Sequence, residues 1–201
     1  MENLPSRAIS RLTLAIGIVA VIGLVAISLF FAVGGFWGPL NDLSIAIEAI
    51  LCALLAWMLH PVFREWSPRS SQLMLLAALA GGVIVSMGSA FVIFKVTGYF
   101  LAGLIMFLGY AFIGLWVLAL NYHSQHHGIW PPGLTRLGQV AGAIMTLGWL
   151  SIPGILGGVD SPTDASWMEN LSQGNALGWM ILLPIWCFWL SRILLKSSSH
   201  K

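Results

Sequence analysis

Six long apolar stretches, separated by short polar connections, constrain this chain more than any other feature of its sequence. About 20 apolar residues are needed for one helix to cross the hydrocarbon core of a bilayer. Only 8% of the 201 residues are charged, whereas soluble domains carry about 25%. The sequence therefore predicts an all-α, polytopic membrane helical bundle of six transmembrane helices. We expect one integral membrane domain over residues 1–201, because the spans leave no room for a separate soluble domain.

Proline and glycine set the expected helix ends. Trp37-Gly38-Pro39, Pro61 and the pair Pro131-Pro132 interrupt the apolar stretches, and proline inside a helix removes a hydrogen bond and clashes with the preceding turn. The first apolar run is much longer than the core of a signal peptide, which predicts a retained helix. We expect the six helices at about residues 12–36, 43–60, 72–94, 99–122, 137–156 and 176–195.

The distribution of lysine and arginine predicts the orientation. Basic residues accumulate in the cytoplasmic connections of membrane proteins. With both termini cytoplasmic, only Lys95 lies on the outer side. The other eight lie on the cytoplasmic side, and they are Arg7, Arg11, Arg64, Arg69, Arg136, Arg192, Lys196 and Lys201. The sequence therefore predicts a multi-pass protein of the bacterial cytoplasmic (inner) membrane.

A threefold pattern also runs along the chain. The odd-numbered helices start with similar triplets, Ser10-Arg11-Leu12, Ser71-Gln72-Leu73 and Thr135-Arg136-Leu137, and each triplet follows a proline. A supersecondary unit that recurs at a fixed spacing is typical of repeat architectures. The pattern suggests three tandem helical hairpins, although any six-span protein with short loops shows similar spacing.

Glu48 is the one acidic residue within an apolar span, and such residues usually have a functional or pairing role because a buried charge is costly in lipid. It is expected about one and a half turns below the outer boundary, with Lys95 at the end of the next helix as its counter-charge.

Residues three or four apart share a helix face. Ser44 and Cys52 therefore share the face of Glu48, and in the fourth helix Met106, Tyr110, Gly114 and Asn121 form a second polar stripe. Our candidates for a ligand or ion pathway are Glu48, Lys95, Ser44, Tyr110, Asn121 and Trp149.

Four histidines are weaker candidates for metal ligands, namely His60, His123, His126 and His127. His123 and His127 would share a face if the fourth helix continued through them, and His60 ends the second helix on the same side of the membrane. Zinc sites need three or four ligands, whereas histidine at a helix end also complements the helix dipole without any metal. We therefore predict no metal and no other cofactor.

Three classes of function remain open. The leading hypothesis is a non-enzymatic bundle that binds a lipid-like ligand or a partner subunit in the membrane. The alternative is a small transporter or proton-coupled channel centred on Glu48. An enzyme that uses the cytoplasmic histidines is the third.

The chain has no phosphate-binding loop, dinucleotide fingerprint or hydrolase motif. The expected partners are membrane lipids, with a homo-oligomer or a membrane complex left open, and the scattered basic residues predict no nucleic-acid partner.

Overall fold

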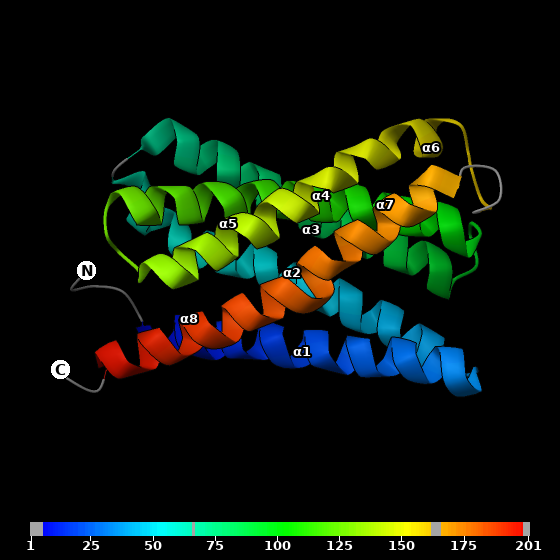
Figure 1. Ribbon diagram of the computed structural model, residues 1–201, viewed down its shortest axis with the longest axis horizontal. Coiled ribbons are helices and arrows are strands. Elements are labelled where there is room, and N and C mark those ends of the chain that lie inside the picture. The colour runs from blue at the N-terminus through cyan, green and yellow to red at the C-terminus, as the bar shows by residue number, and fades with distance from the viewer. Residues whose placement is uncertain (1–5, 66, 162–165, 199–201) are drawn as a thin grey trace.

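The computed structural model describes residues 6–65, 67–161 and 166–198, and within these ranges every regular element is a helix (Figure 1). The elements are α1 (Ser6–Val33), α2 (Trp37–Arg64), α3 (Pro68–Ile93), α4 (Tyr99–His126), α5 (Pro132–Thr146), the 3₁₀ segment η1 (Leu147–Ser151), α6 (Ile152–Leu156), α7 (Ser166–Ala176), the π-helical segment η3 (Leu177–Leu182) and α8 (Leu183–Ser198).

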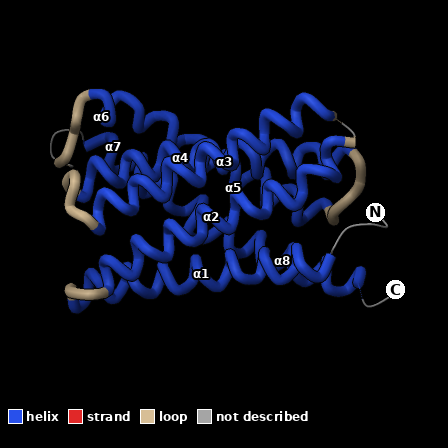
Figure 2. The backbone as a smooth tube through the Cα atoms, turned by 180° about the vertical axis from the view of Figure 1, so that it is seen from behind, coloured by secondary structure: helices blue, strands red, loops and turns tan. Residues whose placement is uncertain are grey.

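Six helical stretches in this part of the chain are long and apolar enough to cross a membrane. Four are α1 to α4, the fifth combines α5, η1 and α6, and the sixth runs from Gly174 to Lys196. The prediction of an all-α bundle with six spans is therefore confirmed, as expected for a multi-pass membrane protein. Figure 2 shows the loops at the two ends of the bundle. We call the end where α1 begins the proximal end and the opposite end the distal end.

Several helices begin earlier or end later than predicted. Residues Trp37 to Pro39, predicted to form a turn, form the first turn of α2, and α2 continues beyond Pro61 to Arg64. Proline is tolerated in the first turn of a helix, where its missing N–H has no intrahelical partner. As a result Glu48 lies about three turns from the start of α2, deeper than predicted.

The spans pack in chain order, and α1 closes the arrangement against α8 (Figure 1). At the proximal end Ser10 Oγ donates to Ser191 O at 3.0 Å, and Ser191 Oγ donates to Ser10 O at 2.9 Å. These reciprocal bonds join the first helix to the last. Because α2 also packs extensively on α3, and α4 on α5, the three predicted hairpins are not separate packing units.

Helix α4 lies at the centre of this packing, with contacts to α2, α3, α5, α6, α7 and η1. Its close approach to α5 depends on glycine. A Cβ atom added at Gly142 would lie 2.6 Å from Gly114 O, so the two backbones leave no room for a side chain. Small residues allow such approaches in membranes, where apolar surface alone gives helices little reason to associate.

The fifth and sixth spans both depart from α-helical geometry, the fifth in its second half and the sixth near its start. The fifth becomes 3₁₀ at Leu147–Ser151, ahead of Pro153, and the sixth becomes π-helical at Leu177–Leu182, ahead of Pro184. Each proline removes one backbone donor from its helix. The fully buried Asn175 connects the two spans, because its Nδ2 donates to Met145 O at 2.8 Å.

Two long-range hydrogen bonds to Asp160 position the start of α4 at the distal end. Asp160 Oδ2 accepts from Gly98 N at 2.8 Å, and Asp160 Oδ1 accepts from Leu101 N at 3.0 Å. An acidic side chain that accepts from the first N–H groups of a helix satisfies donors that have no intrahelical partner. The loop after α6 is thereby held against the N-terminus of α4.

We expect Gly142→Ala to lower the free energy of unfolding by about 1–3 kcal/mol, because the added methyl group overpacks the contact between α4 and α5. Gly103→Ala is the matched control, since a Cβ at Gly103 meets no atom within 4 Å. Thermal unfolding of both variants in detergent measures the difference. Equal stability of the two variants would contradict the close contact.

Candidate functional site

A cavity of about 340 Å³ lies at the distal end of the bundle. Four segments line it, namely the end of α1, the start of α2, the start of α4 and the junction of α7 with η3. The lining residues are Ile27, Phe31, Asn41, Asp42, Ile45, Tyr99, Phe100, Gly103, Met106, Phe107, Ala176, Trp179 and Met180. Its walls are therefore mainly apolar and aromatic, which is typical of pockets that bind small molecules.

The polar part of the cavity wall comes from the start of α2. Asn41 and Asp42 are each only 4% exposed, and Asn41 Nδ2 donates to Asp42 Oδ1 at 3.3 Å. Asp42 was expected in the outer connection before the second helix. Because α2 starts at Trp37, this carboxyl group instead lies in the helix and lines the cavity.

Glu48 lies deeper in α2 and belongs to a buried polar centre together with Tyr110 and Trp179. The Tyr110 hydroxyl donates to Glu48 Oε2 at 3.4 Å, and Glu48 is 1% exposed. Tyr110 in turn stacks on Trp179, with ring centroids 4.5 Å apart and planes 9° from parallel. Since Trp179 also lines the distal cavity, this tryptophan connects the cavity to the pair formed by Glu48 and Tyr110.

Unpartnered polar atoms gather around these two features. Four buried side-chain atoms of the described residues have no hydrogen-bonding partner, and they are Asn41 Oδ1, Glu48 Oε1, Asn175 Oδ1 and Trp179 Nε1. Asn41 and Trp179 line the cavity, Asn175 precedes the lining residue Ala176, and Glu48 is in the polar centre. Buried polar groups are nearly always satisfied in folded proteins. Three of the four residues therefore line the distal cavity or directly precede a lining residue in the chain.

The predicted pairing of Glu48 with Lys95 is wrong. Lys95 lies just after α3 at the distal end, with an exposed side chain and a left-handed backbone (φ 55°). Glu48 accepts from Tyr110 instead, and its other oxygen has no partner within the described part of the chain. The deeper position of Glu48 along α2 explains the separation.

The other predicted pathway residues, Ser44, Asn121 and Trp149, lie in separate parts of the bundle. Ser44 is buried and bonds to Leu40 O within its own helix, and Asn121 Oδ1 accepts from Trp186 Nε1 at 3.0 Å. Trp149 is 36% exposed and packs on Phe112, outside the distal cavity. The stripes on α2 and α4 face the bundle as predicted. They meet at the bond between Glu48 and Tyr110.

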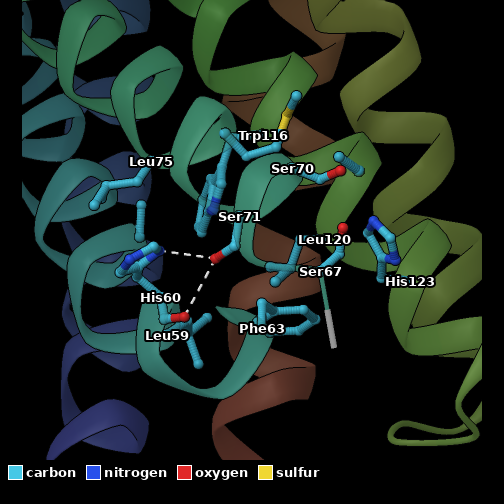
Figure 3. Close-up of a pocket in the computed structure, with 13 residues that line it drawn as sticks. Leu59, His60, Phe63, Ser67, Ser70, Ser71, Leu75, Trp116, Leu120 and His123 are labelled. Carbon is cyan, nitrogen blue, oxygen red and sulfur yellow. Dashed lines mark hydrogen bonds between the residues drawn. The ribbon is translucent and has the colours of Figure 1, made fainter. Parts of the chain in front are cut away.

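A second, much smaller pocket of about 30 Å³ lies at the proximal end, where α2, α3 and α4 meet (Figure 3). His60 Nδ1 lies 2.8 Å from Ser71 Oγ, which also bonds to His60 O at 3.2 Å. His123 lines another side of the pocket (Figure 3). The volume admits a few water molecules at most, so this pocket is too small for an organic ligand.

The four candidate histidines, His60, His123, His126 and His127, do not come together as a metal site. His126 Nδ1 is bonded to Tyr122 O at 3.0 Å, and both His126 and His127 are exposed. No group of three or more histidine, cysteine or acidic side chains among residues 6–65, 67–161 and 166–198 is arranged to hold a metal ion. The buried Cys52 and Cys187 are both free thiols.

Sequence reasoning missed the residues that define the cavity. Asn41 and Asp42 follow a glycine-proline turn signal and were placed outside the helix, and Trp179 was one of several tryptophans within spans. Asn41 and Asp42 could have been found from the sequence, because proline is tolerated in the first turn of a helix and α2 can therefore begin at Trp37. No signal in the sequence brings Trp179 next to Tyr110.

Compared with protein-family models, with curated proteins and with solved structures, the chain matches none.

We expect Tyr110→Phe to destabilise the protein by about 1–2 kcal/mol, because it removes the donor that bonds to Glu48 and leaves a buried carboxyl group without its partner. Tyr122→Phe is the control, since Tyr122 is 55% exposed. Chemical or thermal unfolding in detergent compares the two. A Tyr110→Phe variant as stable as Tyr122→Phe would show that the 3.4 Å contact contributes nothing.

Proposed function

We propose that this protein is a non-enzymatic membrane bundle that binds an amphipathic small molecule in its distal cavity. The observation that carries the proposal is a cavity of about 340 Å³ whose walls are aromatic and aliphatic, with two buried polar side chains, Asn41 and Asp42, at one edge. Pockets for small ligands have volumes of about 300–1,000 Å³ and a few polar groups that fix orientation. The volume and the lining both match that description.

The polar edge of the cavity supports the same proposal. Asp42 is buried, lines the cavity, and accepts one side-chain hydrogen bond, from Asn41. A buried polar group without enough partners is costly. A ligand that bonds to this carboxyl group would recover free energy, whereas a purely aliphatic lipid chain would not. We therefore propose an amphipathic ligand with its polar group toward α2.

We further propose that the distal end faces the outside of a bacterial cytoplasmic membrane. Seven described basic residues lie at the proximal end, near the start of α1, the end of α2, the starts of α3 and α5, and the end of α8. These are Arg7, Arg11, Arg64, Arg69, Arg136, Arg192 and Lys196, whereas Lys95 lies at the distal end and Lys201 falls outside the described residues. The tendency of basic residues to remain cytoplasmic supports this orientation. The cavity would then receive its ligand from the outer leaflet.

Filling the cavity tests the binding function. We expect Gly103→Leu to reduce binding of a dansyl-labelled alkyl amphiphile at least about tenfold, because Gly103 lines the cavity and its added side chain projects into open space. Energy transfer from the protein's tryptophans to the dansyl group, in nanodiscs, measures occupancy. Gly174→Leu is the matched control, since it also has open space at its Cβ but does not line the cavity. Equal binding by both variants would exclude the cavity as the site.

One observation favours a second candidate, a proton-coupled transporter. Glu48 is buried at about three turns into α2 with one oxygen unpartnered, and the fifth and sixth spans are both interrupted. Interrupted helices at mid-depth are typical of secondary transporters. In that case the carboxyl group of Glu48 would take up and release the coupling proton.

Proteoliposomes separate the two candidates. A transporter predicts that a pH gradient drives uptake of the dansyl amphiphile and that Glu48→Gln abolishes this uptake, because glutamine keeps the shape of the side chain and loses the proton. The binding proposal predicts no gradient-driven uptake and unchanged cavity binding by Glu48→Gln. Gradient-driven uptake by the wild-type protein that Glu48→Gln removes would replace the binding proposal with the transporter.

A further inference from the structure

We infer that the ligand of the distal cavity carries a protonated amine, which Asp42 recognises between aromatic side chains. The inference rests on the proposed function, because it names the chemical class that the same cavity selects. It concerns the charge of the polar group, about which the volume of the cavity says nothing.

The sign of the charge follows from Asp42. Asp42 is 4% exposed and lines the cavity, and its carboxyl group accepts a hydrogen bond from the neutral amide of Asn41 at 3.3 Å. The described residues that line the cavity include no lysine, arginine or histidine. A buried carboxylate requires a compensating positive charge or several hydrogen bonds. Because the cavity wall supplies neither, an occupant with a cationic group is the natural counterpart.

The polar edge of the cavity favours an amine that keeps at least one N–H group. An ammonium N–H can donate to the Asp42 carboxylate, and hydrogen bonds that involve a charged group are roughly twice as strong as neutral ones. A quaternary ammonium has no N–H group to donate.

The rest of the wall suits the same group. Aromatic side chains from α1, α4 and η3 line the cavity, and they are Phe31, Tyr99, Phe100, Phe107 and Trp179. Cations are attracted to the faces of aromatic rings, most strongly where water is excluded. An anionic head group would instead meet the carboxylate of Asp42 and the electron-rich ring faces. The cavity therefore discriminates between cationic and anionic amphiphiles through its charge and not through its size.

Two probes that differ only at the polar end test the inference, namely a dansyl-labelled decylamine with a free terminal ammonium group and its terminal alcohol analogue. Nanodiscs of phosphatidylcholine, which has no net charge, limit recruitment of the amine by the bilayer itself, and empty discs give the background. We expect the wild-type protein to bind the amine at least about tenfold more tightly than the alcohol. Asp42→Asn, which preserves the shape of the side chain, should abolish that preference.

The outcomes distinguish the inference from the proposed function. If the wild-type protein binds both probes equally and Gly103→Leu weakens both, the cavity is a binding site and the preference for an amine is refuted. If neither probe binds, or if Gly103→Leu has no effect on either, the proposed function itself fails. If Asp42→Asn binds neither probe, the ratio of the two affinities in the wild-type protein decides the question.

Discussion

In a hydrocarbon environment no water is present to satisfy backbone N–H and C=O groups, so each departure from α-helical geometry must be compensated by the protein itself. The fifth and sixth spans of this protein both make such departures, and Asn175 joins them through its bond to Met145 O. This bond holds the start of the sixth span against α5 at the level where the helix changes to π geometry. The position of Trp179, and with it one wall of the distal cavity, depends on this arrangement.

The fold also depends on the central position of α4 in the bundle. Glycines at its contacts with α5 bring the two backbones close together, and the polar stripe of α4 is then turned toward α2 and the sixth span. Tyr110 can therefore contact both Glu48 and Trp179. A large side chain at the glycine contact would move α4 outward, so the packing of small residues and the geometry of the polar centre are physically coupled.

The two ends of the bundle differ in chemistry. The proximal end is held together by hydroxyl hydrogen bonds, with Ser10 bonded to Ser191 and Ser71 to His60. The pocket between α2, α3 and α4 at this end holds little more than water. At the distal end Asp160 satisfies the first donors of α4 and leaves a much larger, aromatic cavity beside it. The aromatic cavity and most of the unpartnered polar atoms thus lie toward the same end.

The sequence by itself determined the fold class, the number of spans and the bundle-facing stripes of α2 and α4, because hydrophobic length and helical periodicity are local properties. It misplaced the start of α2, because proline is accepted in the first turn of a helix. It also paired Glu48 with Lys95 from their order along the chain, although order alone does not fix depth in the bundle. Only the tertiary structure brought Asp42, Tyr99 and Trp179 to one cavity, because these residues come from separate spans and their contact depends on how the interrupted helices pack around α4.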